Sequence, residues 1–158
     1  MAFDLSRSGR LSTTVSALPS CLGIELGPSR WHRVDQDSVD TFAKLTGDFS
    51  FIHVDPDRAR ETRFGGTIVH GYFVLSLLSP IIIELMEVSD SSLGVNYGVD
   101  KVRFPGPLPV GASFRGSGTI NAVKPVPGGF EVMVAYRMQV KGQERPALVA
   151  ECRFRYYA

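Results

Sequence analysis

The segment Tyr72–Ile83 reads YFVLSLLSPIII and constrains the fold more than any other part of the sequence. It is too short to cross a bilayer, which takes about 20 apolar residues, and it ends at the charged Glu84. We therefore expect a helix over residues 70–88 that is buried within the protein and that kinks or restarts at Pro80. Such a helix needs partners around most of its surface, because apolar residues occupy nearly every side of it.

From residue 93 onward apolar residues alternate with polar ones, which is the period of a half-buried strand. Strands are expected over residues 93–104, 113–123, 130–140 and 148–156, with turns rich in Gly and Pro between the later ones. Helices followed by antiparallel strands are typical of the α+β class. A curved antiparallel sheet can wrap the apolar helix, so we expect this arrangement.

Helix-start and helix-end residues organise the part of the chain that precedes the apolar run. A short strand is expected within residues 22–34, interrupted at Gly27-Pro28. One helix is predicted between Asp35 as its N-cap and Gly47 at its end. A short helix is predicted at residues 56–62, because Asp55-Pro56 combines a cap with a proline at the first helical position.

Composition excludes several classes of function. The 158 residues carry 17 Lys and Arg against 16 Asp and Glu, and a net charge of +1 leaves no positive excess for a nucleic acid or an anionic membrane. Cys21 and Cys152 lack the CxxC spacing, so a reduced cytoplasmic protein without a zinc ribbon is expected. Residues 1–20 show no signal peptide and no sustained period, which predicts a loosely ordered arm before a single domain at residues 21–158.

The polar residues that can carry chemistry gather between Gly47 and Gly71, where two of the three histidines lie. Asp48 and His53 follow the end of the first predicted helix and are separated by a partly aromatic stretch. A carboxylate and an imidazole held side by side among apolar groups can orient one water molecule and move one proton. The alternative is structural, with the aspartate capping a turn and the histidine hydrogen-bonded in the core.

His70 and Gly71 stand at the start of the apolar helix, where backbone N–H groups and the positive end of the helix dipole are free for a ligand. Gly71 lets a ligand oxygen approach the backbone closely, although a small residue is equally expected where a helix crosses a strand. His53, Asp55 and His70 also match the two histidines and one carboxylate of a non-haem iron site. Because Asp55 already serves as an N-cap, we expect no metal.

Two stretches of the chain resemble the hydratase signature of the MaoC-like (R)-specific enoyl-CoA hydratases: Asp40–Asp55, DTFAKLTGDFSFIHVD, and Phe64–Leu78, FGGTIVHGYFVLSLL. Asn96–Gly111, NYGVDKVRFPGPLPVG, and the ending RPALVAECRFRYY are similar to the nodulation-protein-N-like branch of that family. The resemblance covers about residues 35–157. It implies the hot-dog fold, in which a long central helix is wrapped by an antiparallel sheet.

The resemblance also implies roles for single residues. Asp48 and His53 match the catalytic pair that holds the water added across a double bond. Gly71 matches the glycine whose N–H polarises the thioester carbonyl. Ser79 falls where some members carry a serine that supports the aspartate, and with His70 it is assigned to substrate binding.

One departure from the family concerns the pair that precedes Ile-His. Relatives commonly carry Asn-Pro or Gln-Trp there, whereas this chain carries Ser50-Phe51. We therefore expect Phe51 to line and reshape the acyl pocket.

The resemblance implies a hydro-lyase that reversibly hydrates trans-2-enoyl thioesters to (R)-3-hydroxyacyl thioesters. No cofactor is expected, because the thioester itself acidifies the α carbon. The expected partners are an acyl thioester, carried by coenzyme A or an acyl-carrier protein, and a second copy of the chain in a homodimer with each pocket near the interface. Two other functions stay open: a hot-dog acyl-CoA thioesterase and a non-catalytic acyl-thioester binding protein.

Overall fold

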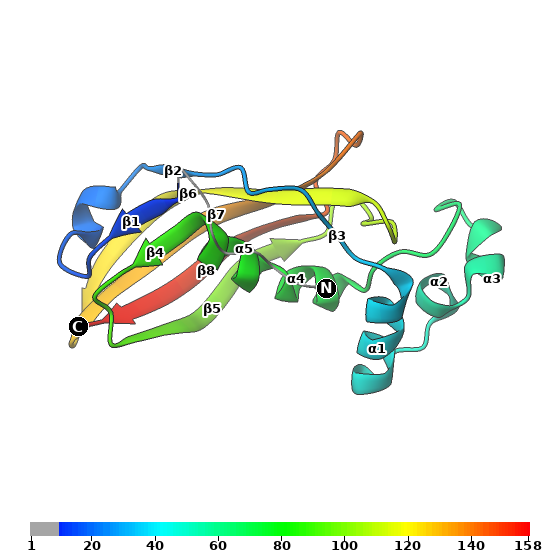
Figure 1. Ribbon diagram of the computed structural model, residues 1–158, viewed down its shortest axis with the longest axis horizontal. Helices are drawn as coiled ribbons and strands as arrows, with labels where there is room; N and C mark the ends of the chain where they lie inside the picture. The colour runs from blue at the N-terminus through cyan, green and yellow to red at the C-terminus, as the bar shows by residue number, and fades with distance from the viewer. Residues whose placement is uncertain (1–9) are drawn as a thin grey trace.

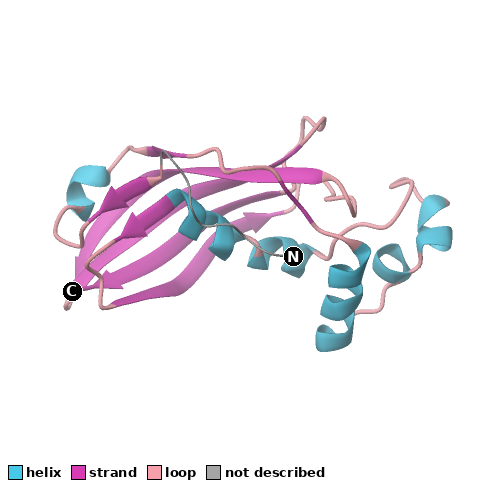
Figure 2. Cartoon of the chain, in the orientation of Figure 1, coloured by secondary structure: helices cyan, strands magenta, loops and turns pink. Residues whose placement is uncertain are grey.

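The computed structural model describes residues 10–158, in which a curved sheet lies behind a broken helix (Figure 1). Figure 2 shows the long strands as one curved layer, with helices in front of it and beyond its ends. Residues Leu11–Thr13 and Met86–Val88 form a separate two-stranded sheet. The elements are β1 (Leu11–Thr13), η1 (Leu18–Cys21), β2 (Glu25–Leu26), β3 (His32–Arg33), α1 (Gln36–Thr46), α2 (Phe51–Val54), α3 (Pro56–Arg60), α4 (Gly71–Ser76), α5 (Leu78–Leu85), β4 (Met86–Val88), β5 (Leu93–Arg103), β6 (Ser113–Val126), β7 (Gly129–Val140) and β8 (Leu148–Tyr157).

The main sheet is antiparallel and has the strand order β2-β6-β7-β8-β5, with β3 pairing to β6 beside β2. Alternation along β7 and β8 sends one set of side chains into the core and the other set outward. The inward set is buried: Val132, Val134, Tyr136, Met138, Val140, Leu148, Ala150, Cys152 and Phe154. The four predicted strands and the α+β class are confirmed.

The apolar segment is broken into α4 and α5 at Leu77, and both helices pack against the sheet. Pro80 lies in the first turn of α5 and has no N–H for the carbonyl of Ser76, so the hydrogen-bond ladder restarts there as expected. Two features differ from the prediction of one helix over residues 70–88. The helix ends at Leu85 because the chain turns into β4, and one face of it is exposed, at Tyr72 and Ile83.

The prediction of a loosely ordered arm over residues 1–20 is wrong for residues 11–20, while residues 1–9 lie outside the described part. Strand β1 pairs in parallel with β4, and the side chain of Leu18 is fully buried. The Val15 N–H donates a 2.7 Å hydrogen bond to the carboxylate of Asp90. The few apolar residues of this segment are spaced without a period, which is why alternation did not reveal their burial.

Helices α1, α2 and α3 lie together beyond one end of the sheet (Figure 1). The N-cap of α1 is Asp35, whose carboxylate accepts from the Ser38 N–H, and its C-cap is Gly47 in the left-handed region at φ 78°. Asp55 caps α3 in the same way, through the Arg58 N–H. Both caps are as predicted, and between them the chain forms the additional turn of helix α2.

No helix within residues 10–158 is both long enough and apolar enough to span a membrane.

Candidate active site

The loop between α1 and α2 brings the predicted aspartate and histidine to the same place. Asp48 is exposed, and its carboxylate accepts from the Ser50 N–H at 3.2 Å, which fixes the turn into α2. His53 lies on α2 and is only 8% exposed. A carboxylate oxygen of Asp48, a ring nitrogen of His53 and a ring nitrogen of His70 all lie within 4.8 Å of one another. A separation of this size can be bridged by one water molecule.

Backbone carbonyls hold both imidazoles of the site. The Nδ1 of His53 lies 2.7 Å from the carbonyl oxygen of Ile68, and the Nε2 of His70 lies 2.9 Å from that of Asp48. A carbonyl oxygen only accepts, so these two nitrogens carry the protons. The Nε2 of His53 is therefore left with a lone pair that can take up a proton.

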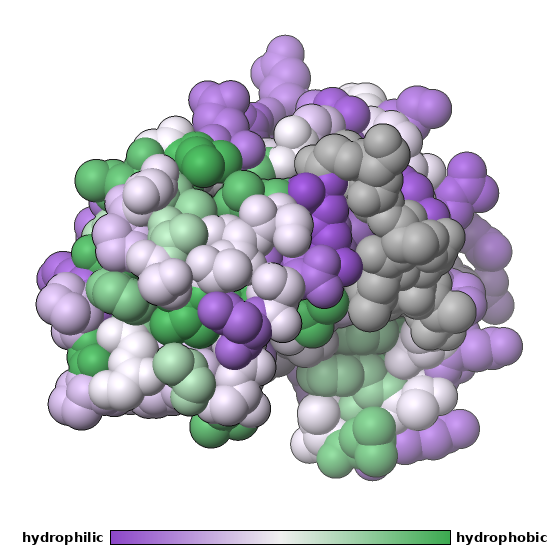
Figure 3. Space-filling view, turned by 60° about the vertical axis from the view of Figure 1, so that its left-hand side comes forward, coloured by the Kyte–Doolittle hydropathy of each residue, from purple (hydrophilic) through white to green (hydrophobic). Residues whose placement is uncertain are grey.

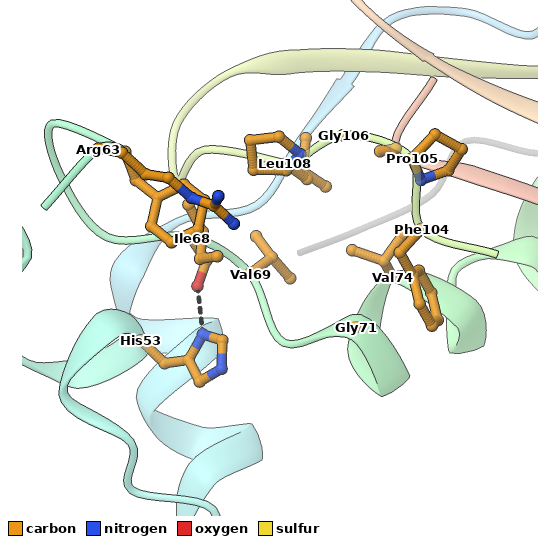
Figure 4. Close-up of a pocket in the computed structure, with 13 residues that line it drawn as sticks. His53, Arg63, Ile68, Val69, Gly71, Val74, Phe104, Pro105, Gly106 and Leu108 are labelled. Atoms are coloured by element: carbon orange, nitrogen blue, oxygen red, sulfur yellow. Dashed lines mark hydrogen bonds between the residues drawn. The ribbon is translucent and has the colours of Figure 1, made fainter. Parts of the chain in front are cut away.

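A cavity of about 250 Å³ opens beside His53 and Gly71 (Figure 4). Its wall is apolar over most of its extent, and Arg63 contributes the charged side chain. The other lining residues are Phe64, Ile68, Val69, Val74, Phe104, Pro105, Gly106, Pro107, Leu108 and Ala147. Figure 4 shows the ring of Phe104 beside Gly71, at the start of α4. The cavity therefore places a basic nitrogen and a helix N-terminus around one apolar space.

Gly71 is the first residue of α4, so its N–H has no acceptor within the helix. A Cβ placed on Gly71 would meet the Phe104 ring at 3.4 Å, inside the cavity. Gly71 thus presents its backbone to the cavity without a side chain.

The pKa of His53 is lowered below its ordinary value of 6.5. Burial is the largest cause, because it disfavours the charged imidazolium. The hydrogen bond to Ile68 opposes the shift, the neighbouring His70 adds to it, and the carboxylate of Asp48 opposes it. The balance keeps His53 neutral at neutral pH, which is the form that can act as a base.

The geometry does not favour a metal ion held by both histidines. The rings of His53 and His70 are stacked, with centroids 3.9 Å apart and planes inclined by 26°. Each lone pair lies in its own ring plane, and one ion cannot lie in two nearly parallel planes at the ~2.0–2.1 Å of a zinc–nitrogen bond. Asp55, the carboxylate of the iron motif, is occupied as the N-cap of α3.

The structure separates the remaining predicted residues from this cavity. The ring of Phe51 lies under the guanidinium of Arg58, with 4.3 Å between the centroid and Cζ, and is not among the lining residues. The Ser79 hydroxyl accepts from the side-chain amide of Asn96 at 3.3 Å and borders two other cavities between α5 and β5. Within one chain, Phe51 therefore does not line the cavity beside His53, and the Ser79 hydroxyl contacts Asn96 and not Asp48.

Sequence reasoning missed most of the cavity wall. The segment Phe104–Leu108 begins at the end of one predicted strand and precedes the next, and it forms the side of the cavity opposite His53. Two pairings hold this segment there: the Val69 N–H donates to the Leu108 carbonyl at 2.8 Å, and Ile68 forms a bridge with Pro109. The run of prolines marked an irregular segment, but no local pattern indicates such long-range pairings.

Comparisons with known proteins agree with the fold. The family model of the MaoC like domain matches residues 19–141. The chain is 39% identical over 150 residues to 3-hydroxyacyl-thioester dehydratase Z of Mycobacterium tuberculosis, covering 94% of this chain and 99% of that protein. It is 40% identical over 141 residues to nodulation protein N of Rhizobium leguminosarum bv. viciae, covering 87% of each.

Among solved structures, the (R)-hydratase from A. caviae involved in PHA biosynthesis superposes with a TM-score of 0.69 at 23% identity, over 84% of this chain and 94% of that one. This likeness confirms the hot-dog fold. Because the family model spans most of the chain and relatives share about 40% of their residues with it, the protein belongs to the MaoC-like dehydratase family.

Proposed function

We propose that this protein is an (R)-specific hydratase that interconverts trans-2-enoyl thioesters and (R)-3-hydroxyacyl thioesters. The observation that carries the proposal is the unprotonated Nε2 of His53, a residue that lines the same cavity as Gly71, with the carboxylate of Asp48 close to the imidazole. The similarity to 3-hydroxyacyl-thioester dehydratase Z, at 39% identity, supports the same reaction.

In the hydration direction, Asp48 and His53 orient one water molecule and take a proton from it as its oxygen bonds to C3. The electron pair of the double bond moves toward the carbonyl oxygen, which gains negative charge. The Gly71 N–H, at the N-terminus of α4, stabilises that charge. The proton then returns to C2, so the elements of water are added and nothing is left over. The reverse sequence is dehydration.

The carrier of the acyl group is coenzyme A or an acyl-carrier protein, and the apolar wall of the cavity suits a thioester and the adjacent carbons. Incubation with crotonyl-CoA and longer enoyl-CoA esters tests the proposal. Loss of the enoyl absorbance without release of free thiol is expected, with (R)-3-hydroxyacyl-CoA as the product. Thiol release would indicate a thioesterase, and binding without turnover would indicate an acyl-thioester binding protein.

We also propose that two copies form a homodimer. Strand β5 is one edge of the main sheet, so one side of its backbone can pair with a second chain. The strand also exposes the apolar side chains of Leu93, Tyr97 and Val99. Apolar residues also reach the surface on the face seen in Figure 3. Beside the site, Phe49 is 58% exposed and Asp48 is exposed too, so a single chain does not exclude water from Asp48.

Light scattering at micromolar concentration tests the assembly, with a dimer mass expected. Val99→Glu places a charge on the exposed edge and should shift the mass toward that of one chain. The matched control is Lys141→Glu, a charge change on an exposed turn outside β5. A wild-type protein that runs as a monomer would contradict the homodimer.

A further inference from the structure

His70 is in contact with each part of the proposed catalytic apparatus, although it does not line the cavity. Its Nε2–H donates to the carbonyl oxygen of Asp48, and its ring lies against the ring of His53. It is the N-cap of α4, so a single peptide bond joins it to Gly71. These three contacts come from one side chain and its own backbone.

The surroundings of His70 fix its ring in place. The residue is 2% exposed, and the ring of Phe42 from α1 lies 5.0 Å from it at an angle of 50°. Phe42 is itself stacked on Phe73 of α4, with centroids 4.9 Å apart. The imidazole of His70 therefore lies between an aromatic pair and His53, and it has little freedom to rotate.

Within residues 10–158, only one of the two ring nitrogens of the buried His70 is hydrogen-bonded. The Nδ1 of His70 is buried and has no hydrogen-bond partner among the described residues, which is a cost to the folded state. A phenylalanine would avoid that cost and keep the aromatic packing. What it would not supply is the N–H that holds the backbone of Asp48.

We propose that His70 is a positioning residue, which fixes the backbone of Asp48 and the imidazole of His53 relative to each other and so supports turnover rather than substrate affinity. This inference rests on the proposed function of Asp48 and His53. It replaces the earlier expectation that His70 binds substrate, because the ring lies behind His53 and outside the lining of the cavity.

Two substitutions separate the two contacts. His70→Phe keeps an aromatic ring against His53 but removes the N–H donor to Asp48. His70→Gln keeps a donor at about the position of Nε2 but removes the stacked ring. For each, kcat should fall about 10–100-fold, since small misplacements of catalytic groups cost this much, while KM stays within about threefold. Using both variants covers the case in which one fails to fold.

Histidine NMR gives a readout that does not depend on turnover. The chain has three histidines, so their titrations can be assigned by single substitutions. The electrostatic interaction with His70 lowers the pKa of His53, so the midpoint of His53 should move to higher pH in both variants. His32→Gln is the matched control: it keeps a donor to Glu84 of α5, and His32 is not among the groups that shift the pKa of His53, so the His53 midpoint should stay unchanged.

An unchanged His53 midpoint in both His70 variants, or an unchanged kcat in both, would overturn the positioning role. A wild-type protein that turns over no enoyl thioester would overturn the proposed function and, with it, the catalytic part of this inference. The NMR midpoints would still show whether His70 controls His53. The two failures are therefore distinguishable.

Discussion

His53 and Ile68 are joined by the 2.7 Å hydrogen bond from the Nδ1–H of the histidine to the carbonyl of the isoleucine. The Ile68 N–H in turn donates to the Ile52 carbonyl at 3.0 Å. Two hydrogen bonds to Ile68 thereby join helix α2 to the segment that leads into α4. The same bond selects the tautomer of His53, so that its Nε2, and not its Nδ1, is the basic atom.

The lowered pKa of His53 predicts the pH dependence of the reaction. A base must be unprotonated, so kcat/KM should hold its plateau below pH 6.5, the ordinary value for histidine, and decline only in more acidic solution. A pH profile of kcat/KM checks this. Asp48→Asn removes the carboxylate that favours the imidazolium, so the NMR titration midpoint of His53 should fall further. An acid limb well above pH 6.5 would contradict the assignment.

The same shift has a consequence for stability. The unfolded chain binds a proton on this histidine at a higher pH than the folded chain does, so the free energy of unfolding falls as pH drops through the ordinary histidine range. Above that range His53 is neutral in both states and contributes no pH dependence. In His53→Phe, this part of the acid sensitivity should be absent, as measured by thermal unfolding between pH 5 and 8.

Local patterns in the sequence were sufficient to predict the sheet and the helix ends. Alternation along β7 and β8 depends only on which face meets the core, and the caps at Asp35, Gly47 and Asp55 depend on residues a few positions away. The site was predicted to the extent that Asp48 and His53 are close in sequence. Ring stacking between His53 and His70 depends on the pairing of Ile68 with Ile52 and was not predictable from spacing.

The sequence did not predict which way the side chains of Ser79 and Phe51 point. Ser79 is on α5, the helix after the one that begins at the site, and its hydroxyl faces Asn96 of β5. Phe51 precedes His53 by two residues, yet its ring turns toward Arg58 of α3. In both cases the residue lies near the site in sequence, and the orientation of a helical side chain decides what it contacts.

Phe51→Ala tests the acyl-pocket role that the sequence suggested for this residue. Because the ring stacks with Arg58 and does not line the cavity beside His53, chain-length preference within one subunit should be nearly unchanged. Loss of the ring should lower the free energy of unfolding by about 1–3 kcal/mol. Rates across enoyl-CoA chain lengths are the measurement. A clear change in selectivity would place Phe51 in a pocket completed by a second subunit.

Gly71→Ala tests whether the thioester lies against the backbone of Gly71. The added Cβ would lie 3.4 Å from the Phe104 ring, which is tolerable packing, and alanine is the better helix former. The melting temperature should therefore stay the same or rise slightly. A methyl group that projects into the cavity should nevertheless displace the thioester, and kcat/KM should fall by about 10²-fold or more. Unchanged kinetics would exclude Gly71 from the site.

Asp48 and Glu84 are two carboxylates in opposite settings, and they give a matched pair of variants. Asp48 is exposed, and an asparagine keeps the acceptor for the Ser50 N–H. Glu84 is fully buried in α5, where its carboxylate accepts from the Arg30 N–H and pairs with the Nε2 of His32, both at 2.7 Å. We expect Glu84→Gln to lower the free energy of unfolding by roughly 1.5–3 kcal/mol, seen as a melting temperature several degrees lower, while kcat per folded molecule is retained.

Asp48→Asn should show the reverse pattern, with the melting temperature almost unchanged and kcat reduced about 10²–10⁴-fold. His53→Ala should lower kcat by the same order. Since both groups act on one water molecule, the double variant should be little slower than the slower single variant, because removing either one already disables the pair. Steady-state rates on crotonyl-CoA and longer enoyl-CoA esters decide this. If Asp48→Asn hydrates them at the wild-type rate, or if the two losses multiply, Asp48 and His53 do not act together on one water.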